Sequence, residues 1–413
     1  MKVICQRCGC HSRRVVLGLA ALCLVLALLI ACASTEPSEV GVTKQVAPKI
    51  EPVETPNSGG VTGLPSPYDA DNDGIGDSIE DKLAKRFAPV VRLHPDDAYR
   101  PADIPWYLTR VRMCFDIRWW FDRIILKPGQ VDLPCLTSQS CLGQLSTLGA
   151  TLTSFVLEHT DRYGGDRLDS YRKQTRQGSK PSDWVCYTHV SPAPAKDHLG
   201  MYDVQYIFFF GYNGDICWGP IESGHEADFE HITVRVEDDR ETIHGIYYST
   251  HEGEGKWYAP ETSPGSSNGY AVTTGGHPIV YSALNSHACY PWAGEWNRLR
   301  NFNDFTADGG PEWDCQANIV SLGEKQNPRD GMQWIQYSGR WGEIGEVGFT
   351  TSPYGPAYQD WWNEEVPEGV APRATSALSL NSGGIVVAVI IGMTLVGALT
   401  FAFYRFARRA KRP

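Results

Sequence analysis

The sequence lacks the short motifs that identify the commonest enzyme classes. It contains no Gly-x-Ser-x-Gly nucleophile elbow, no phosphate-binding P-loop and no dinucleotide-binding glycine fingerprint. The pair His225-Glu226 is not followed by a histidine at the spacing of zinc metalloproteases, because the next histidine is His231. No catalytic residue is therefore assigned, and the sequence favours a protein that is not an enzyme.

The central part of the chain has little basic charge. Nine of the 37 lysine and arginine residues lie in residues 1–33 and 405–413, which contain no acidic residue. The remaining 28 basic residues stand against all 48 acidic ones, which leaves a formal charge of −20. A domain this acidic repels phosphate backbones and attracts cations, so nucleic acid is not expected as a partner.

Two long apolar runs lie near the ends of the chain. Residues 1–33, a basic leader followed by an apolar run, are expected to be a signal peptide or a signal anchor. The residues around Cys32 fit either signal-peptidase cleavage or lipidation of Cys32, and the sequence does not choose between them. Residues 383–404 are uncharged and long enough to cross about 30 Å of hydrocarbon as a helix.

The charges beside these runs predict an orientation. Residues 405–413 carry five basic groups, so this tail is expected to be cytoplasmic and the central part to lie on the other side of the membrane. We therefore expect a single-pass membrane protein whose ectodomain is extracellular, periplasmic or lumenal.

If the central part is exported, its cysteines can form disulfides. Seven of the twelve lie in the central part, and an exported domain with seven accommodates up to three disulfides. Cys135 and Cys141 are six residues apart in a turn-rich stretch and are predicted to form a local pair. Spacing does not determine the pairing of the others.

Residues 69–80 (DADNDGIGDSIE) match a twelve-residue calcium loop. Gly74 stands at the sixth position, where the chain must turn sharply, and Gly76 stands where an aliphatic residue is usual. A proline-rich stretch replaces the entering helix, so residues 69–87 are expected to be a calcium loop with an exiting helix. The predicted ligands are the side chains of Asp69, Asp71, Asp73, Asp77 and Glu80 and the backbone carbonyl of Ile75.

The rest of the central part has the pattern of a β protein. Residues 89–94, 106–111, 242–250, 256–258 and 278–283 predict strands, and the aromatic run 202–212 predicts a fully buried central strand. The expected fold is mainly β, an antiparallel sandwich or jelly roll. We expect this domain to span residues 88–351 with an insertion near residues 112–183, between a flexible tether (34–68) and a stalk (352–382).

A second cluster of metal-ligand residues lies in residues 224–231 (GHEADFEH), at the start of a β-branched run. In an extended chain Asp228 and Glu230 share one face, whereas Phe229 and His231 share the other. Together with His225, expected in the preceding loop, these two carboxylates suit a hard divalent cation. The alternative is a set of ordinary polar residues at a strand end.

Several of these segments resemble the vacuolar protein sorting-associated protein 62 family, in the order in which that family has them. They are residues 87–96, the aromatic strand, the octet 224–231, residues 247–251 and residues 281–288. Residues 340–342 and 352–356 are similar to the closing segment of that family, so the resemblance covers roughly residues 80–365.

The octet is also similar to the Gly-His-Arg-His-Asp-Trp-Glu motif of necrosis- and ethylene-inducing peptide-like proteins. That resemblance implies a β-sandwich with a cation, calcium or magnesium, held by His225, Asp228 and Glu230. Ala227 and Phe229 replace the second histidine and the tryptophan of the motif, which argues against the membrane-damaging activity of those toxins.

The expected function is that of a membrane-anchored, calcium-binding β domain that acts as a binding or sorting module for a protein, glycan or lipid ligand. Two alternatives stay open. One is a metal-dependent hydrolase at His225, Asp228 and Glu230, and the other is a cytolysin-like protein that acts on membranes.

Overall fold

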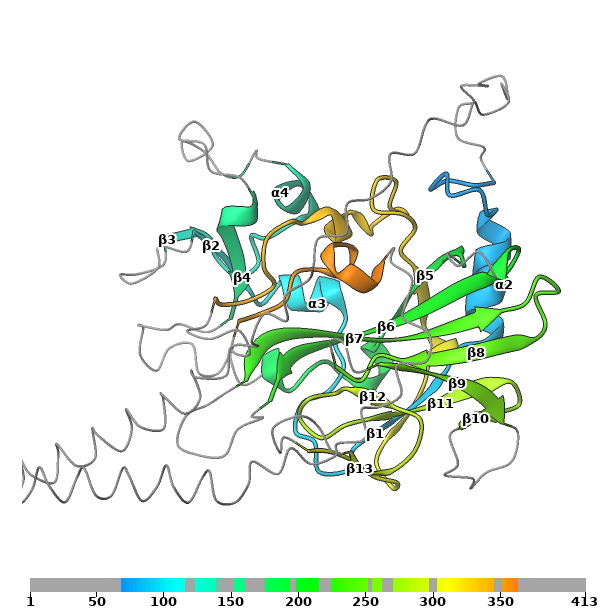
Figure 1. Cartoon of the computed structure of the whole chain (residues 1–413). Coiled ribbons are helices and arrows are strands. Elements are labelled where there is room, and N and C mark those ends of the chain that lie inside the picture. Colours follow the sequence, from blue (N-terminus) through cyan, green and yellow to red (C-terminus); the bar gives the residue numbers. More distant parts are fainter. Residues whose placement is uncertain are drawn as a thin grey trace, which may run out of the picture. The chain divides into compact units, whose positions relative to one another are not determined.

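Strands dominate the described part of the chain, and its helices are few and short (Figure 1). The computed structural model describes residues 68–115, 123–138, 141, 152–159, 175–193, 198–214, 224–251, 255–261, 270–296, 303–344 and 351–362. These residues belong to one unit, residues 62–375. The expected leader, apolar span and basic tail, and the tether except for Tyr68, lie outside the described residues. Within the described part, no helix is both long and apolar enough to cross a bilayer.

The helices are α2 (Asp77–Arg86), α3 (Ile104–Leu108) and α4 (Leu133–Thr137), together with short 3-10 turns. The strands are β1 (Val90–Leu93), β2 (Arg112–Phe115), β3 (Arg123–Leu126), β4 (Phe155–Glu158), β5 (Cys186–Pro192), β6 (Tyr202–Asn213), β7 (His225–Val236), β8 (Ile243–Tyr248), β9 (Lys256–Glu261), β10 (Tyr270–Thr274), β11 (His277–Ser282), β12 (Cys289–Tyr290), β13 (Gly294–Trp296), β14 (Asp304–Thr306), β15 (Glu312–Asp314) and β16 (Ile319–Ser321).

Eleven of the strands form one sheet in the order β15-β1-β11-β10-β9-β8-β7-β6-β5-β16, with β12 beside β11. The expected antiparallel pairing is wrong at three places in this sheet, because β1 pairs with β11, β9 with β10 and β5 with β16 in parallel. The partners in the β1–β11 and β5–β16 pairs lie far apart in sequence, so the local strand pattern does not reveal these pairings. The prediction of a mainly β domain is confirmed.

Strand β6 is an interior strand that pairs with β5 on one edge and β7 on the other, and it is buried as its sequence predicts. All its residues except Tyr202 are buried, and they alternate between two cores. Ile207 and Phe209 belong to the core on one face, whereas Tyr206, Phe208 and Phe210 belong to the core on the other. A strand covered on both faces needs apolar residues at consecutive positions, which explains the unbroken aromatic run.

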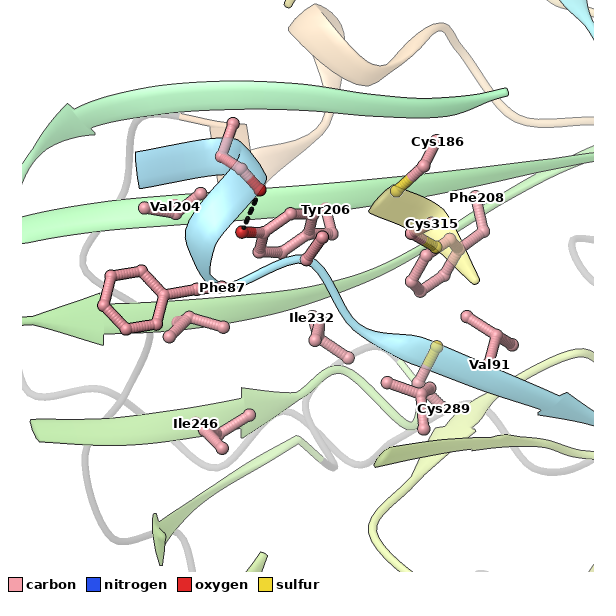
Figure 2. Close-up of a cluster of buried hydrophobic side chains, with 14 of the residues drawn as sticks. Phe87, Val91, Cys186, Val204, Tyr206, Phe208, Ile232, Ile246, Cys289 and Cys315 are labelled. Carbon is pink, nitrogen blue, oxygen red and sulfur yellow. Dashed lines mark hydrogen bonds between the residues drawn. The ribbon is translucent and has the colours of Figure 1, made fainter. Parts of the chain in front are cut away.

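The core that contains Phe208 collects side chains from both ends of the strand order (Figure 2). Trp313 of β15 packs edge-on against Phe208 of β6, with ring centroids 5.5 Å apart. The sheet therefore folds over on itself and encloses this core. The Tyr206 hydroxyl donates to the Ala84 carbonyl over 2.8 Å and holds the end of α2 against β6.

The predicted strand at residues 106–111 is wrong, because the chain forms helix α3 there. The Asp103 carboxylate accepts a hydrogen bond from the Trp106 backbone N–H, and Pro105 lies in the first turn. An aspartate cap and a first-turn proline favour a helix start, and they outweigh the aromatic composition.

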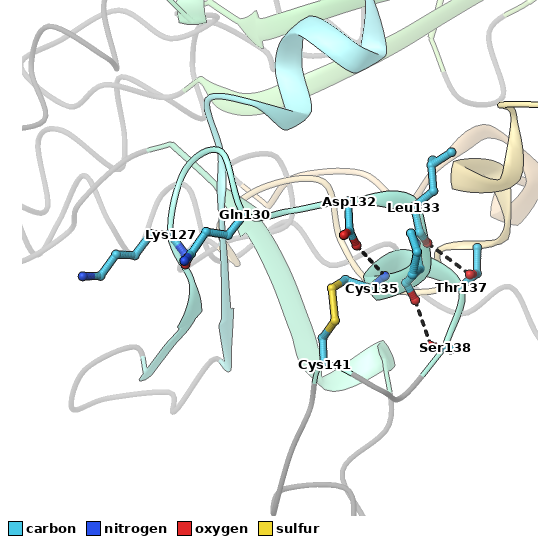
Figure 3. Close-up of a disulfide and its surroundings, with 9 residues drawn as sticks. Lys127, Gln130, Asp132, Leu133, Cys135, Thr137, Ser138 and Cys141 are labelled. Carbon is cyan, nitrogen blue, oxygen red and sulfur yellow. Dashed lines mark hydrogen bonds between the residues drawn. A yellow bond between two sulfur atoms is a disulfide. The ribbon is translucent and has the colours of Figure 1, made fainter.

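The insertion contributes a small antiparallel sheet, β3-β2-β4, and the predicted disulfide between Cys135 and Cys141 (Figure 3). The bond joins Cys135, which lies within α4, to Cys141, which follows the helix. Asp132 caps α4 by accepting a hydrogen bond from the Cys135 backbone N–H over 3.0 Å. The prediction of this local pair is confirmed.

The β domain continues beyond residue 351, where the stalk was expected to begin. Trp361 stacks on His231 with ring centroids 4.1 Å apart, and Trp362 stacks on His189 at 4.0 Å. The Gln205 side chain also donates to the Trp361 carbonyl over 2.8 Å. Composition rich in proline and glycine does not distinguish a stalk from a packed irregular segment, so the boundary moves to at least residue 362.

Candidate functional site

The acidic loop, residues 69–80, is folded by its own carboxylates. Asp69 accepts backbone N–H groups from Asn72 and Gly74, and Asp77 accepts that of Ala70 over 2.8 Å. Gly74 has φ of +94°, a conformation that glycine adopts without strain. The loop then runs directly into α2, which begins at Asp77 as the exiting helix of the predicted motif.

Three carboxylates of this loop converge. Oxygen atoms of Asp71, Asp73 and Glu80 lie within 4.8 Å of one another, and those of Asp69, Asp71 and Asp77 form a second such group. Asp71 and Glu80 are only 2% and 1% exposed. Burial of carboxylates so close together is costly without a cation or protons.

The electrostatics of the loop reflect this convergence. Burial, aided by the neighbouring Asp73, raises the pKa of Asp71 to about 6. Burial and the charges of Asp71 and Asp73 raise the pKa of Glu80 to about 8, although Arg329 opposes the rise. Asp71 Oδ1 and Asp73 Oδ2 are buried and accept no hydrogen bond. Buried carboxylate oxygens that lack donors are the chemistry that a hard divalent cation needs, so these residues fit calcium.

Ile75 fills the seventh position of the loop in a way that suits the motif. Its side chain is buried in the core that contains Phe208, and its N–H donates to Asp73 Oδ1 over 2.6 Å. The side chain therefore anchors the loop to the β domain, and the backbone carbonyl stays the expected ligand.

Sequence reasoning missed the segment that faces the acidic loop. Arg329, which lies 249 positions after Glu80, forms ion pairs with both Asp77 and Glu80. The Asn327 side chain donates to the Asp71 carbonyl over 2.9 Å. Nothing in the local sequence of residues 322–329 marks it as a partner of residues 69–80, because only the fold brings the two segments together.

The second predicted cluster lies within β7, and His225 begins that strand instead of preceding it. His225 Nδ1 contacts the Ala227 carbonyl at 2.8 Å, Asp228 lies 6% exposed, and Glu230 accepts from the Ser249 hydroxyl over 3.3 Å. Among the described residues, the groups with all donor atoms within 4.8 Å do not include this trio. The structure therefore places the three residues on one strand end without bringing their donor atoms together.

Asp228 is instead the centre of a buried polar network. His287 Nδ1 lies 2.9 Å from Asp228 Oδ2, and its Nε2 lies 3.5 Å from Asp97 Oδ2. The same Asp228 oxygen accepts from the Asn213 side chain over 3.0 Å. The His287 ring stacks face to face on Phe210, with centroids 3.8 Å apart. An imidazole between two carboxylates is thus held rigidly at the end of β6 and β7.

A second carboxylate–imidazole pair lies beside the first. Asp304 contacts His251 Nε2 and accepts from the hydroxyls of Ser286, at 2.9 Å, and Tyr290, at 2.6 Å. Ser286 directly precedes His287, so one turn links the two pairs. The two carboxylates of these pairs, Asp97 and Asp304, were not singled out from the sequence as site residues.

The backbone around this network is strained. Ala227, Thr250, Asn285 and His287 all have φ between +49° and +65°. Side chains with a Cβ rarely adopt this region, and such residues cluster at functional sites when the surrounding structure enforces them. The network, defined by Asp97, Asn213, Asp228, His251, Ser286, His287 and Asp304, is therefore a second candidate site.

Glu226 of the octet has a structural role on the opposite face. Its carboxylate accepts backbone N–H groups from His159 and Glu343, at 3.2 and 3.3 Å. Gly342 lies so close to Glu226 that a Cβ at this position would stand 2.4 Å from the Glu226 Cβ. The octet thus binds the insertion and the closing segment to the central sheet.

Comparison with known families agrees with the motifs. The family model described as vacuolar protein sorting-associated protein 62 matches residues 183–345. This range contains β5 to β16, the octet and residues 322–329, and the resemblance to this family is confirmed over it. No curated protein sequence matches the chain.

Solved structures of necrosis and ethylene inducing proteins are among the structural matches. One is protein 2 of this kind from the causal agent of cocoa's witches broom disease, with 17% identity, 67% of this chain and 85% of that chain covered, and a TM-score of 0.29. Another is NLPPya in complex with mannosamine, with 11% identity, coverage of 68% and 88%, and a TM-score of 0.31. At these TM-scores the likeness carries no conclusion for this chain.

Proposed function

We propose that this chain is a membrane-anchored, calcium-binding β protein whose ectodomain acts outside the cytoplasm as a binding or sorting module. The observation that carries the calcium part is the convergence of Asp71, Asp73 and Glu80, with buried oxygens that accept no hydrogen bond. The ligands would be the five carboxylates of residues 69–80 and the Ile75 carbonyl. The name of the matched family supports a role in sorting.

Anchoring is inferred from the apolar runs at residues 15–33 and 383–404 and from the basic groups that flank them. An exported ectodomain meets millimolar calcium, a concentration that suits a loop of modest affinity. The ligand of the module would be a protein, a glycan or a lipid surface.

We also infer a second cation site, for calcium or magnesium, at His225, Asp228 and Glu230. Its support is the donor set and the strained backbone that surrounds Asp228. His225 would join such a site through Nε2 and keep its Nδ1 contact with the Ala227 carbonyl, because a metal-binding imidazole commonly donates its other ring N–H to a backbone carbonyl.

Calcium titration of the full-length protein tests the proposal. Isothermal titration should give saturable binding, and saturation at about 100 times Kd should stabilise the fold by about 2.7 kcal/mol. That free energy corresponds to a rise in Tm of roughly 4 °C for a domain of this size. Asp73→Asn should lose both effects, because it replaces a ligand carboxylate by an amide.

Asp132→Asn is the matched control. Asp132 also accepts a backbone N–H group, but asparagine caps a helix as well as aspartate does, so binding should persist. A wild-type protein with neither binding heat nor a Tm shift on adding calcium or EDTA would remove the calcium part of the proposal.

The polar network favours one second candidate, a metal-dependent hydrolase. A carboxylate-bound imidazole in a strained turn, such as His287 on Asp228, is a common arrangement for a general base. Turnover of an ester or glycan substrate that Asp228→Asn abolishes, with calcium binding at residues 69–80 retained, would support it. A broad panel of substrates that wild type and Asp228→Asn treat alike would exclude it.

A further inference from the structure

Arg329 occupies a position that no calcium-loop motif assigns. One guanidinium nitrogen pairs with Asp77 and another with Glu80, so a single side chain bridges the ninth and twelfth positions of residues 69–80. The twelfth residue is the one that closes a calcium loop through both carboxylate oxygens. Arg329 therefore holds an oxygen, Glu80 Oε2, that the cation itself would require.

The segment that carries Arg329 is held in a turn by backbone hydrogen bonds. The Arg329 N–H donates to the Leu322 carbonyl over 2.9 Å, and Gly323 and Pro328 form an antiparallel bridge. Within the same turn, Glu324 contacts His189 Nε2 at 2.9 Å, and His189 stacks on Trp362. The Arg329 guanidinium therefore reaches the acidic loop from a turn that backbone hydrogen bonds hold in place.

The charges explain why such a side chain is useful. Five carboxylates lie within residues 69–80, two of them almost fully buried, and Glu324 adds a further negative charge nearby. A resident cation compensates part of this repulsion when no metal is bound. The same positive charge, a few ångströms from the ligand oxygens, opposes the entry of a divalent cation.

We propose that Arg329 is an internal competitor of calcium: it neutralises residues 69–80 in the calcium-free protein and gives up Glu80 when the ion binds. Calcium binding at this loop is then reversible and weak, and it loosens the turn formed by residues 322–329. This inference rests on the proposed calcium site and defines its regulation.

Calcium titrations of wild type, Arg329→Gln and Arg329→Lys test the idea. Arg329→Gln should bind calcium roughly tenfold more tightly, the effect of removing one partly screened charge close to the ion. In EDTA the same variant should melt several degrees below wild type, because the carboxylates lose their counter-charge. Arg329→Lys keeps the charge and should stay within about threefold of wild type.

Arg92→Gln is the matched control. Arg92 likewise bridges two acids, Asp308 at 3.2 Å and Glu312 at 3.1 Å, but it belongs to β1 rather than to the acidic loop or its facing turn. Its replacement should leave calcium affinity unchanged. Affinity that is unchanged or weaker in Arg329→Gln would overturn the proposal, because Arg329 would then only position Glu80.

Hydrogen exchange on the wild-type protein keeps the test independent of any variant. Calcium should slow the exchange of backbone N–H groups in residues 69–80 and accelerate it in residues 322–329. Slower exchange in both segments would overturn the competitor role while leaving calcium binding intact. The absence of calcium binding in wild type and all variants would instead remove the proposed site itself.

Discussion

His231, the last residue of the octet, should make the protein sensitive to mild acid. It is 4% exposed, it stacks on Trp361, and its Nε2 is buried without a hydrogen bond. Burial lowers the pKa of His231 from 6.5 to about 3. The folded protein therefore keeps this ring neutral at a pH where the unfolded chain has protonated it.

The sign and size of the effect follow from proton linkage. Between pH 6.5 and pH 3 the unfolded chain binds one proton more than the folded protein at this position, so acidification favours unfolding. Each pH unit within this window removes about 1.4 kcal/mol. The loss is therefore about 2 kcal/mol at pH 5 and at most about 5 kcal/mol near pH 3.

His231→Phe isolates this contribution. Phenylalanine retains a planar ring that stacks on Trp361 but binds no proton. Urea unfolding, followed by tryptophan fluorescence, should be measured for both proteins at pH 8, 6 and 5. Wild type should lose about 2 kcal/mol more than His231→Phe between pH 8 and pH 5. Equal losses in the two proteins would show that His231 titrates alike in the folded and unfolded states, which would refute the reasoning.

Three further substitutions test the packing around the sites. Arg235→Met should lower the free energy of unfolding, measured with urea, by about 3–5 kcal/mol. The reason is that the buried carboxylate of Asp203, which accepts two 2.8 Å hydrogen bonds from Arg235, loses this partner. Replacing both residues by apolar ones should restore much of the loss. Cys135→Ser, or reduction of its bond to Cys141, should lower the free energy of unfolding by about 2 kcal/mol, and a Tm unchanged by reductant would contradict this. Gly342→Ala should cost about 1–3 kcal/mol, because its Cβ would overlap β7, and a neutral result would mean that the closing segment moves freely.

The sequence alone was sufficient for the features that depend on neighbouring residues. The acidic loop, its exiting helix α2 and the Cys135–Cys141 pair all involve groups within twelve positions of one another. The aromatic run of β6 was also readable, because a strand buried on both faces has a characteristic composition. The same reasoning failed at residues 106–111, where a cap at Asp103 and a proline outweighed strand-like composition.

Whatever depends on partners distant in sequence was decided by the tertiary structure. Arg329 meets Glu80, and His287 meets both Asp228 and Asp97, across separations that no local pattern encodes. The sequence of the octet showed which residues share a face of β7. It did not show that Asp228 pairs with the His287 imidazole or that His225 contacts the Ala227 carbonyl.

The sequence by itself therefore determined the candidate site residues: the carboxylates of residues 69–80 and the polar residues of the octet. The tertiary structure decided what those residues face, namely a guanidinium at the first cluster and two carboxylate–imidazole pairs at the second. The physical reason is that ligand spacing is a property of the local chain, whereas burial and charge compensation depend on which distant segments the folded sheet brings together.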